Sequence, residues 1–179
     1  MPEFELLFRE SKGQPIQYNG VVLKRIDRFP VKNGDVLACS IEEAIKKDEY
    51  LQGFCIDVTG YCEFDGEIHK KGKGIRVMFW DGYTHPNTMI KVFTKLDHVI
   101  IYNVCEIDIK YFGNDIDGSP LERHAKRLDS KYNGAAMIVE EIEGGRRYRC
   151  SDTSSADKPF PFEDIIFTVK NLGQEMQPN

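Results

Sequence analysis

The sequence predicts an all-β protein, a mostly antiparallel β-sandwich of roughly eight to ten strands with one or two short helices. Apolar and polar residues alternate with a period of two through most of the 179 residues. The alternating runs are short and evenly spaced, and turn-forming stretches such as DGEIHKKGKG, DGYTHPN and KLD separate them. This spacing is typical of a sandwich or barrel, whereas a parallel sheet would need a helix between successive strands.

Ten segments carry the strand pattern. They are expected at residues 3–10, 21–29, 34–39, 53–64, 74–80, 88–95, 98–109, 135–143, 146–151 and 164–171. Gly144 and Gly145 separate two of these runs and predict a tight hairpin, because the favoured two-residue turns need a positive φ. Glu140 and Glu141 would then face the arginines of the following strand as cross-strand partners.

Two segments have helical signals. Ser40 followed by Glu43 forms a capping-box pattern, which predicts a helix from Ile41 to about Tyr50. The segment 112–134 is long for a strand connection, and such connections are often functional loops or mobile segments. Within it, Ser119 followed by Pro120 could begin a short helix.

Length and composition limit the classes of protein. The chain is long enough for one domain, expected at residues 1–172, with a flexible tail at 173–179. The net charge of −5 argues against general nucleic-acid binding, and no apolar run approaches the length of a membrane helix. The N-terminus carries acidic residues where a signal peptide would carry basic ones, so we expect a cytoplasmic protein.

The five cysteines are scattered and contain no CxxC pair, which excludes a zinc knuckle and a thioredoxin-type motif. Four of the five stand inside apolar runs. We therefore expect buried, reduced thiols and no disulfide.

An acidic loop precedes the last predicted strand and is the candidate metal site. Its carboxylates, which would supply the hard oxygens that Ca²⁺ prefers, are Asp152, Asp157, Glu163 and Asp164. The run FEDII at 162–166 resembles the ending of calcium-associated bacterial β-sandwich modules, and this resemblance implies a loop Ca²⁺ ion. The alternative is a polar turn stiffened by Pro159 and Pro161, in which backbone N–H groups satisfy Asp164.

Two turns carry candidate binding residues for a ligand or a partner. One mixes aromatic and polar groups that suit sugar or protein recognition: Trp80, Asp81, Tyr83 and His85. The other is a glycine-rich turn whose cations suit a phosphate or an acidic partner: Lys70, Lys71 and Lys73. The structural alternative places Trp80 in the core and the lysines on a solvated hairpin tip, where they oppose edge-to-edge association.

No P-loop, Rossmann, nucleophile-elbow or zinc-protease motif is present. Three hypotheses remain. The first is a non-enzymatic sandwich that binds a protein partner, as an immunity or inhibitor protein of bacterial or phage conflict systems would. The second is a small-molecule or carbohydrate-binding module with a loop Ca²⁺ site, and the third is a hydrolase with a His/carboxylate site built from loops.

Overall fold

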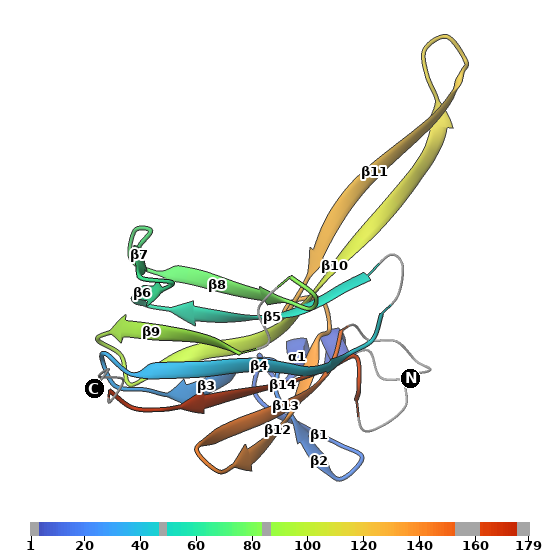
Figure 1. The fold of residues 1–179 in the computed structure, drawn as a ribbon. Coiled ribbons are helices and arrows are strands. Elements are labelled where there is room, and N and C mark those ends of the chain that lie inside the picture. The colour runs from blue at the N-terminus through green and yellow to red at the C-terminus, as the bar shows by residue number, and fades with distance from the viewer. Residues whose placement is uncertain (1–3, 47–49, 84–86, 153–161, 175–179) are drawn as a thin grey trace.

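The computed structural model describes residues 4–46, 50–83, 87–152 and 162–174. Within these ranges the chain forms one short helix and fourteen strands, and every strand pairing is antiparallel. Two large sheets pack face to face, and a long hairpin projects from one of them (Figure 1). The predicted fold class, an all-β sandwich, is confirmed.

The first large sheet has the strand order β11-β10-β5-β8, and β3 pairs with the beginning of β10. Its strands are β3 (Asp27–Pro30), β5 (Tyr50–Val58), β8 (Ile75–Trp80), β10 (His98–Asn114) and β11 (Pro120–Asp129). The second has the order β12-β13-β14-β4-β9-β6-β7. Its strands are β4 (Val36–Ala44), β6 (Gly60–Phe64), β7 (Glu67–His69), β9 (Thr88–Thr94), β12 (Ala136–Ile142), β13 (Gly145–Ser151) and β14 (Ile165–Asn171).

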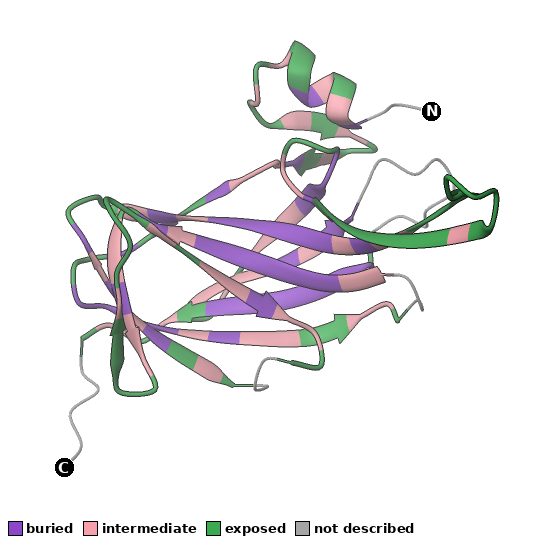
Figure 2. Cartoon of the chain, turned by 90° about the horizontal axis from the view of Figure 1, so that it is seen from above, coloured by how far each residue is buried: buried purple, intermediate pink, exposed green. Residues whose placement is uncertain are grey.

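The core lies between these sheets, where alternate residues of each strand point inward. Phe54 of β5 stacks on Phe79 of the same sheet at 4.6 Å between ring centroids and on Phe167 of the opposite sheet at 4.0 Å. Tyr148 of β13 continues the stack at 4.7 Å from Phe167. Central strands of the body such as β5 and β14 are mostly buried, whereas the projecting hairpin is exposed (Figure 2).

A small N-terminal unit packs beside the second sheet. It consists of α1 (Phe4–Glu10) and the hairpin of β1 (Ile16–Tyr18) and β2 (Val21–Leu23). The prediction of a strand at residues 3–10 was wrong, because Phe4 and Phe8 lie one helical turn apart and are both buried. Glu5 and Arg9 form an i,i+4 ion pair at 2.7 Å on the exposed side.

The predicted helix at residues 41–50 was also wrong. β4 continues to Ala44, β5 begins at Tyr50, and residues 47–49 lie outside the described ranges. The end of β4 pairs with β14, where Phe167 lies opposite Ile41 and Ile166 opposite Glu43, so Glu42 is accommodated by a bulge. Sheet pairing on this strand therefore overrides the local capping-box signal.

The predicted hairpin after β12 is confirmed, with its turn shifted by one residue. Ile142 lies opposite Gly145, so the turn residues are Glu143 and Gly144, and Gly144 has a φ of +77°. A side chain on Gly145 would place its Cβ 2.1 Å from the Val169 carbonyl oxygen. The expected cross-strand charge pairing is also present, since Arg146 binds Glu141 at 2.7 Å and Arg149 binds Glu140 at 3.2 Å.

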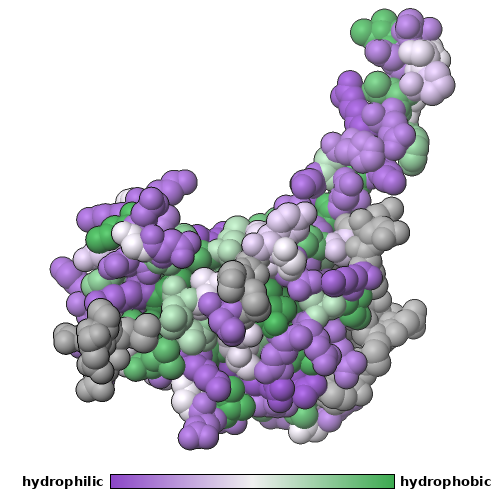
Figure 3. Space-filling view, viewed as in Figure 1, coloured by the Kyte–Doolittle hydropathy of each residue, from purple (hydrophilic) through white to green (hydrophobic). Residues whose placement is uncertain are grey.

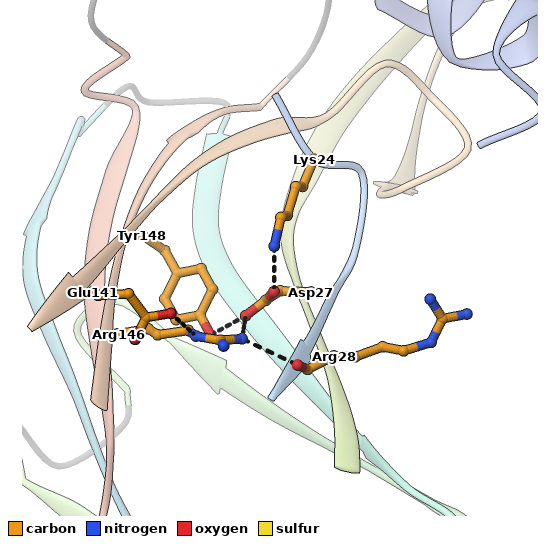
Figure 4. Close-up of polar contacts among 6 residues, drawn as sticks. All are labelled: Lys24, Asp27, Arg28, Glu141, Arg146 and Tyr148. Atoms are coloured by element: carbon orange, nitrogen blue, oxygen red, sulfur yellow. Dashed lines mark hydrogen bonds and ion pairs between the residues drawn. The ribbon is translucent and has the colours of Figure 1, made fainter. Parts of the chain in front are cut away.

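A buried carboxylate joins the two sheets. Asp27 of β3 is 1% exposed and accepts hydrogen bonds from Tyr148 Oη at 2.8 Å, Arg146 Nη1 at 2.9 Å and Lys24 Nζ at 3.1 Å (Figure 4). Arg146 also donates to the Arg28 carbonyl oxygen at 3.0 Å. Burial alone would raise the pKa of Asp27, but the bonds from Tyr148, Arg146 and Lys24 outweigh it and hold the pKa below its usual value.

We predict that Asp27→Asn lowers the free energy of unfolding by about 3 kcal/mol at pH 7, because it removes the buried charge that the partly buried Arg146 and Lys24 share. The pKa of Asp27 is lower in the folded chain, so this contribution is fully present above the unfolded value of about 4. It is lost as the pH falls through the folded pKa. Urea unfolding at several pH values should show the difference between wild type and variant shrinking below about pH 4.

Asp97 supplies the control. Its side chain is exposed and pairs with the neighbouring His98. Asp97→Asn should change stability by less than about 0.5 kcal/mol. An Asp27→Asn variant as stable as this control would contradict the role assigned to the buried cluster.

All five cysteines are buried with free thiols, as expected. Burial raises the pKa of Cys55 to about 12 and also raises the pKa of Cys39 and Cys150. We predict that none of the five reacts with an alkylating reagent at pH 8 in the native chain, while all five react once it is unfolded, as read by mass spectrometry. An unreduced mass two hydrogens lower would reveal a disulfide and contradict this prediction.

Candidate functional site

The hairpin formed by β10 and β11 projects beyond the body of the sandwich (Figure 1). The two strands pair from Cys105–Asp129 out to Asn114–Pro120, and β5 accompanies β10 only as far as Ile107. Beyond that residue, in the described part of the chain, β10 and β11 pair only with each other. We call residues 108–126 the arm.

The sequence interpretation missed the arm and treated residues 112–134 as a loop with a candidate helix at Ser119 and Pro120. The structure corrects this, since β11 begins at Pro120 and extends to Asp129. The sequence did contain a signal for these two strands. The alternation begun at His98 continues to Asn114, the turn DIDGS follows, and LERHAKRL alternates again with Leu121, Ala125 and other residues on one face.

Because side chains alternate across a strand, the arm has two distinct faces. The first, which we call the apolar face, carries Ile109, Tyr111, Leu121, Arg123 and Ala125. The second, the charged face, carries Asp108, Lys110, Phe112, Glu122, His124 and Lys126. No residue that the arm contributes to the apolar face is acidic.

The charged face is covered by ion pairs. Lys126 Nζ lies 3.1 Å from Glu106 Oε1, and His124 Nε2 lies 3.0 Å from Glu122 Oε1. The hydrogen bond with Glu106 raises the pKa of Lys126. These pairs engage Glu122, His124 and Lys126, whereas the apolar face carries no acidic residue and exposes Tyr111, which makes it the candidate contact surface.

Large apolar side chains stand in solvent on the arm. Tyr111 is 54% exposed, Phe112 79%, and Ile116 in the connecting turn is fully exposed. The space-filling view shows apolar patches along the projecting arm and at its tip (Figure 3). Apolar patches on a protein surface can mark a contact with another molecule.

The loop predicted to bind a ligand or partner begins beside the base of the arm. Trp80 lies opposite Gly53, which in turn lies opposite Val104 of β10. A Cβ on Gly53 would fall 2.6 Å from the Trp80 ring, so the glycine makes room for the indole. Asp81 N donates to the Gln52 carbonyl oxygen at 2.9 Å, Tyr83 is 83% exposed, and His85 lies outside the described residues.

The predicted cationic turn lies at the other end of β8. Lys70 sits 5.5 Å from the centroid of the Tyr61 ring, and Lys71 and Lys73 are exposed. His69, at the end of β7, stacks on Phe64 at 3.8 Å. The structure therefore does not bring these lysines together with the Trp80 loop.

A hollow of about 760 Å³ opens between β8 and β9, which belong to opposite sheets. Its walls include Phe64, Met78, Tyr83, Asn87 and Met89. Of the described loop residues that were predicted to bind a ligand, Tyr83 is the one that lines this hollow. The mixture of aromatic, thioether and amide groups is suited to a small, partly apolar molecule.

Of the four carboxylates predicted as metal ligands, the structure brings two together. Asp152 and Asp164 are both buried, and Asp152 N donates to Asp164 Oδ2 at 3.0 Å. Glu163 is exposed, and Asp157 lies outside the described residues. The bond to Asp164 is the one expected if this carboxylate ends a polar turn. Among the described residues no group of three or more His, Cys, Asp or Glu side chains could hold a metal ion.

Candidate acid–base groups are dispersed. His98 Nδ1 lies 2.7 Å from Asp97 Oδ1 at the start of β10, whereas His124 is on the arm. Tyr102 donates to Asp57 at 3.1 Å, and Arg76 binds the same carboxylate at 2.9 Å. Lys131 Nζ lies 4.0 Å from Asp57 Oδ2 as well, so that carboxylate already has three protein partners. Within the described ranges no helix is long and apolar enough to cross a membrane.

The chain matches no family model, no curated protein and no solved structure. Its function must therefore be argued from its own geometry.

We predict that the arm can be removed without destabilising the rest of the domain. Replacing residues 110–124 by Asn-Gly, which joins the paired residues Ile109 and Ala125 through a favoured two-residue turn, should leave the melting temperature within about 2 °C of wild type. The reason is that these residues pair only with each other in the described structure. Differential scanning calorimetry measures the outcome, and a fall of more than about 8 °C would show that the arm stabilises the body.

Proposed function

We propose that this chain is a non-enzymatic protein-binding domain that contacts its partner through the apolar face of the arm. The observation that carries the proposal is the arm itself, a two-stranded hairpin that leaves the body and exposes large apolar side chains. Such an element contributes little to the core of its own domain. It is suited to enter a groove on another molecule.

The chemistry of the arm indicates what the groove should look like. Arg123 is the charged residue that the arm contributes to the apolar face. At the base of the arm, Arg127 binds Asp129 at 2.8 Å. A complementary partner would offer an apolar groove with carboxylates at its rim. The turn at the tip carries Asp115 and Asp117, which oppose both insertion into a bilayer and contact with nucleic-acid phosphates.

The arm also offers main-chain contacts. β11 is an edge strand of the first sheet, so its outer edge is not paired in the described structure. An edge strand can accept a strand from another protein, with backbone hydrogen bonds giving affinity and alternate side chains giving specificity. A hairpin that fills a partner's groove would suit an inhibitor or immunity protein of a bacterial or phage conflict system, and the first partner to test is the product of the neighbouring gene.

The hollow between β8 and β9 favours a second candidate function, binding of a small molecule or carbohydrate. Its volume of about 760 Å³ suits a drug-sized ligand, and Tyr83 supplies an exposed aromatic ring at its wall. We place this function second because few polar groups in the walls of the hollow converge on one point.

We predict that a photo-crosslinking residue at Tyr111, on the apolar face, captures one partner protein in cells, whereas the same residue at Lys110, on the charged face, captures far less. The purified partner should then bind the wild-type chain and lose at least tenfold in affinity with Tyr111→Ser, as measured by calorimetry, because truncating a central aromatic contact costs over 1 kcal/mol.

Lys126→Ala, on the opposite face, is the matched control and should change the affinity less than twofold. Equal capture from both faces would contradict the proposal. So would capture of a second copy of this chain alone, or retention of binding by the chain that lacks residues 110–124.

A further inference from the structure

The strand β8 ends the first sheet on the side away from the arm. The strand order places β11 at one edge of this sheet and β8 at the other (Figure 1). In the described part of the chain, β8 pairs with β5 alone. Among these residues, the second edge of β8 therefore has no neighbouring strand, and we call it the open edge.

The main-chain groups that point to the open edge follow from the ladder with β5. Asp81 N donates to the Gln52 carbonyl oxygen at 2.9 Å, and residues that bond the partner strand alternate along an antiparallel ladder with residues that do not. Phe79 therefore bonds β5, whereas Arg76 and Met78 direct their N–H and C=O groups to the open edge. No main-chain group in the described ranges bonds these two residues from that side.

The open edge lacks the features that usually protect a strand edge, which are lysine, proline, a bulge or a very short strand. β8 has six residues, IRVMFW, and its one charged residue, Arg76, binds Asp57 of β5 at 2.9 Å. The other edges of the described sheets differ. β7 has three residues, β12 is contacted by β2 of the N-terminal unit, and β11 carries charges of both signs.

The hollow of about 760 Å³ runs along the open edge. Three consecutive residues of β8 line it, namely Val77, Met78 and Phe79, and consecutive side chains point to opposite faces of a sheet. A hollow that touches all three lies beside the strand and not over one face. On its other side it is lined by Phe64 and Ile90 of the second sheet. The space therefore combines a free main chain with apolar side chains.

Charges of opposite sign flank the two ends of β8. Lys71 and Lys73 are exposed on the turn that precedes the strand, whereas Asp81 follows it and Asp65 lines the hollow. Every pairing in the described sheets is antiparallel, and an added antiparallel strand would place its C-terminal end beside the lysines. Acidic residues at that end would complement them.

We propose that the open edge of β8 binds an extended segment of a partner protein, which pairs antiparallel with β8 and places alternate apolar side chains in the hollow. The main-chain groups of Arg76 and Met78 supply hydrogen bonds, and the hollow selects the side chains. The segment carries acidic residues after its apolar positions. This site lies at the opposite edge of the sheet from the arm and does not depend on the function proposed for the arm.

The probe is a displayed library of nine-residue peptides of random sequence, selected against the full chain. The selected peptides should alternate apolar and polar residues and end in Asp or Glu. The best peptide is then synthesised, and its affinity is measured by calorimetry. The chain that lacks residues 110–124 should bind it as the wild type does, so that failure of this proposal and failure of the arm proposal are distinguishable.

Two substitutions at one position test the main-chain contact. Met78→Pro removes an N–H that points to the open edge and keeps the bonds to β5, because proline is tolerated on an edge strand where the N–H faces away from the sheet. It should weaken binding of the peptide at least tenfold. The matched control, Met78→Ala, shortens the same side chain but keeps the N–H, and should stay within about threefold of wild type.

A second measurement uses the wild-type chain alone and stays decisive if Met78→Pro does not fold. An added strand bonds β8 through alternate residues only, so N-methylation of one alternate set of peptide nitrogens should abolish binding and N-methylation of the other set should be tolerated. Equal binding of both methylated peptides would overturn the proposal and indicate that the hollow takes a single side chain, as it would take a small molecule. Selection of peptides without alternation, or undiminished binding to a folded Met78→Pro variant, would overturn it as well.

Discussion

The sandwich is held in register by the carboxylate of Asp27. It is buried on β3 of the first sheet and receives Tyr148 and Arg146 from β13 of the second. Stacked rings such as Phe54 on Phe167 hold the sheets together with little directional preference, whereas a buried carboxylate tolerates only positions at which its donors reach it. The cluster thus sets which residues of the two sheets face each other.

Fixing β3 also determines where the arm can start. β3 and β11 both pair with the same edge of β10, β3 with residues 98–101 and β11 from Cys105 onward. β3 therefore occupies the first part of this edge and limits β11 to the distal part. Since β5 stops accompanying β10 at Ile107, the rest of the hairpin extends away from both sheets. The projection is a consequence of strand lengths and pairing.

The sequence was sufficient for the fold class, the hairpin after β12 and the buried thiols, because period-two alternation and glycine turns are local signals. It failed where a local signal competes with a distant partner. Ser40 and Glu43 satisfy a capping pattern, yet pairing with β14 makes the segment a strand. Contacts between distant segments gave no such signal: Tyr83 and Trp80 could be predicted from one loop, but Gln52 donates to Asp152, 100 residues away, and Asn103 donates to Ser151, 48 residues away.

Buried polar contacts at the base of the arm have a mechanical consequence. Contact of the proposed kind would transmit force from the arm to its base, and a base held by apolar contacts alone could slide with little cost in free energy. Directional bonds from Asn103 to Ser151 and from Gln52 to Asp152 tie β10 and β5 to the end of β13 at this point. Polar groups are costly to bury, and their position here suggests that orientation of the arm is what they provide.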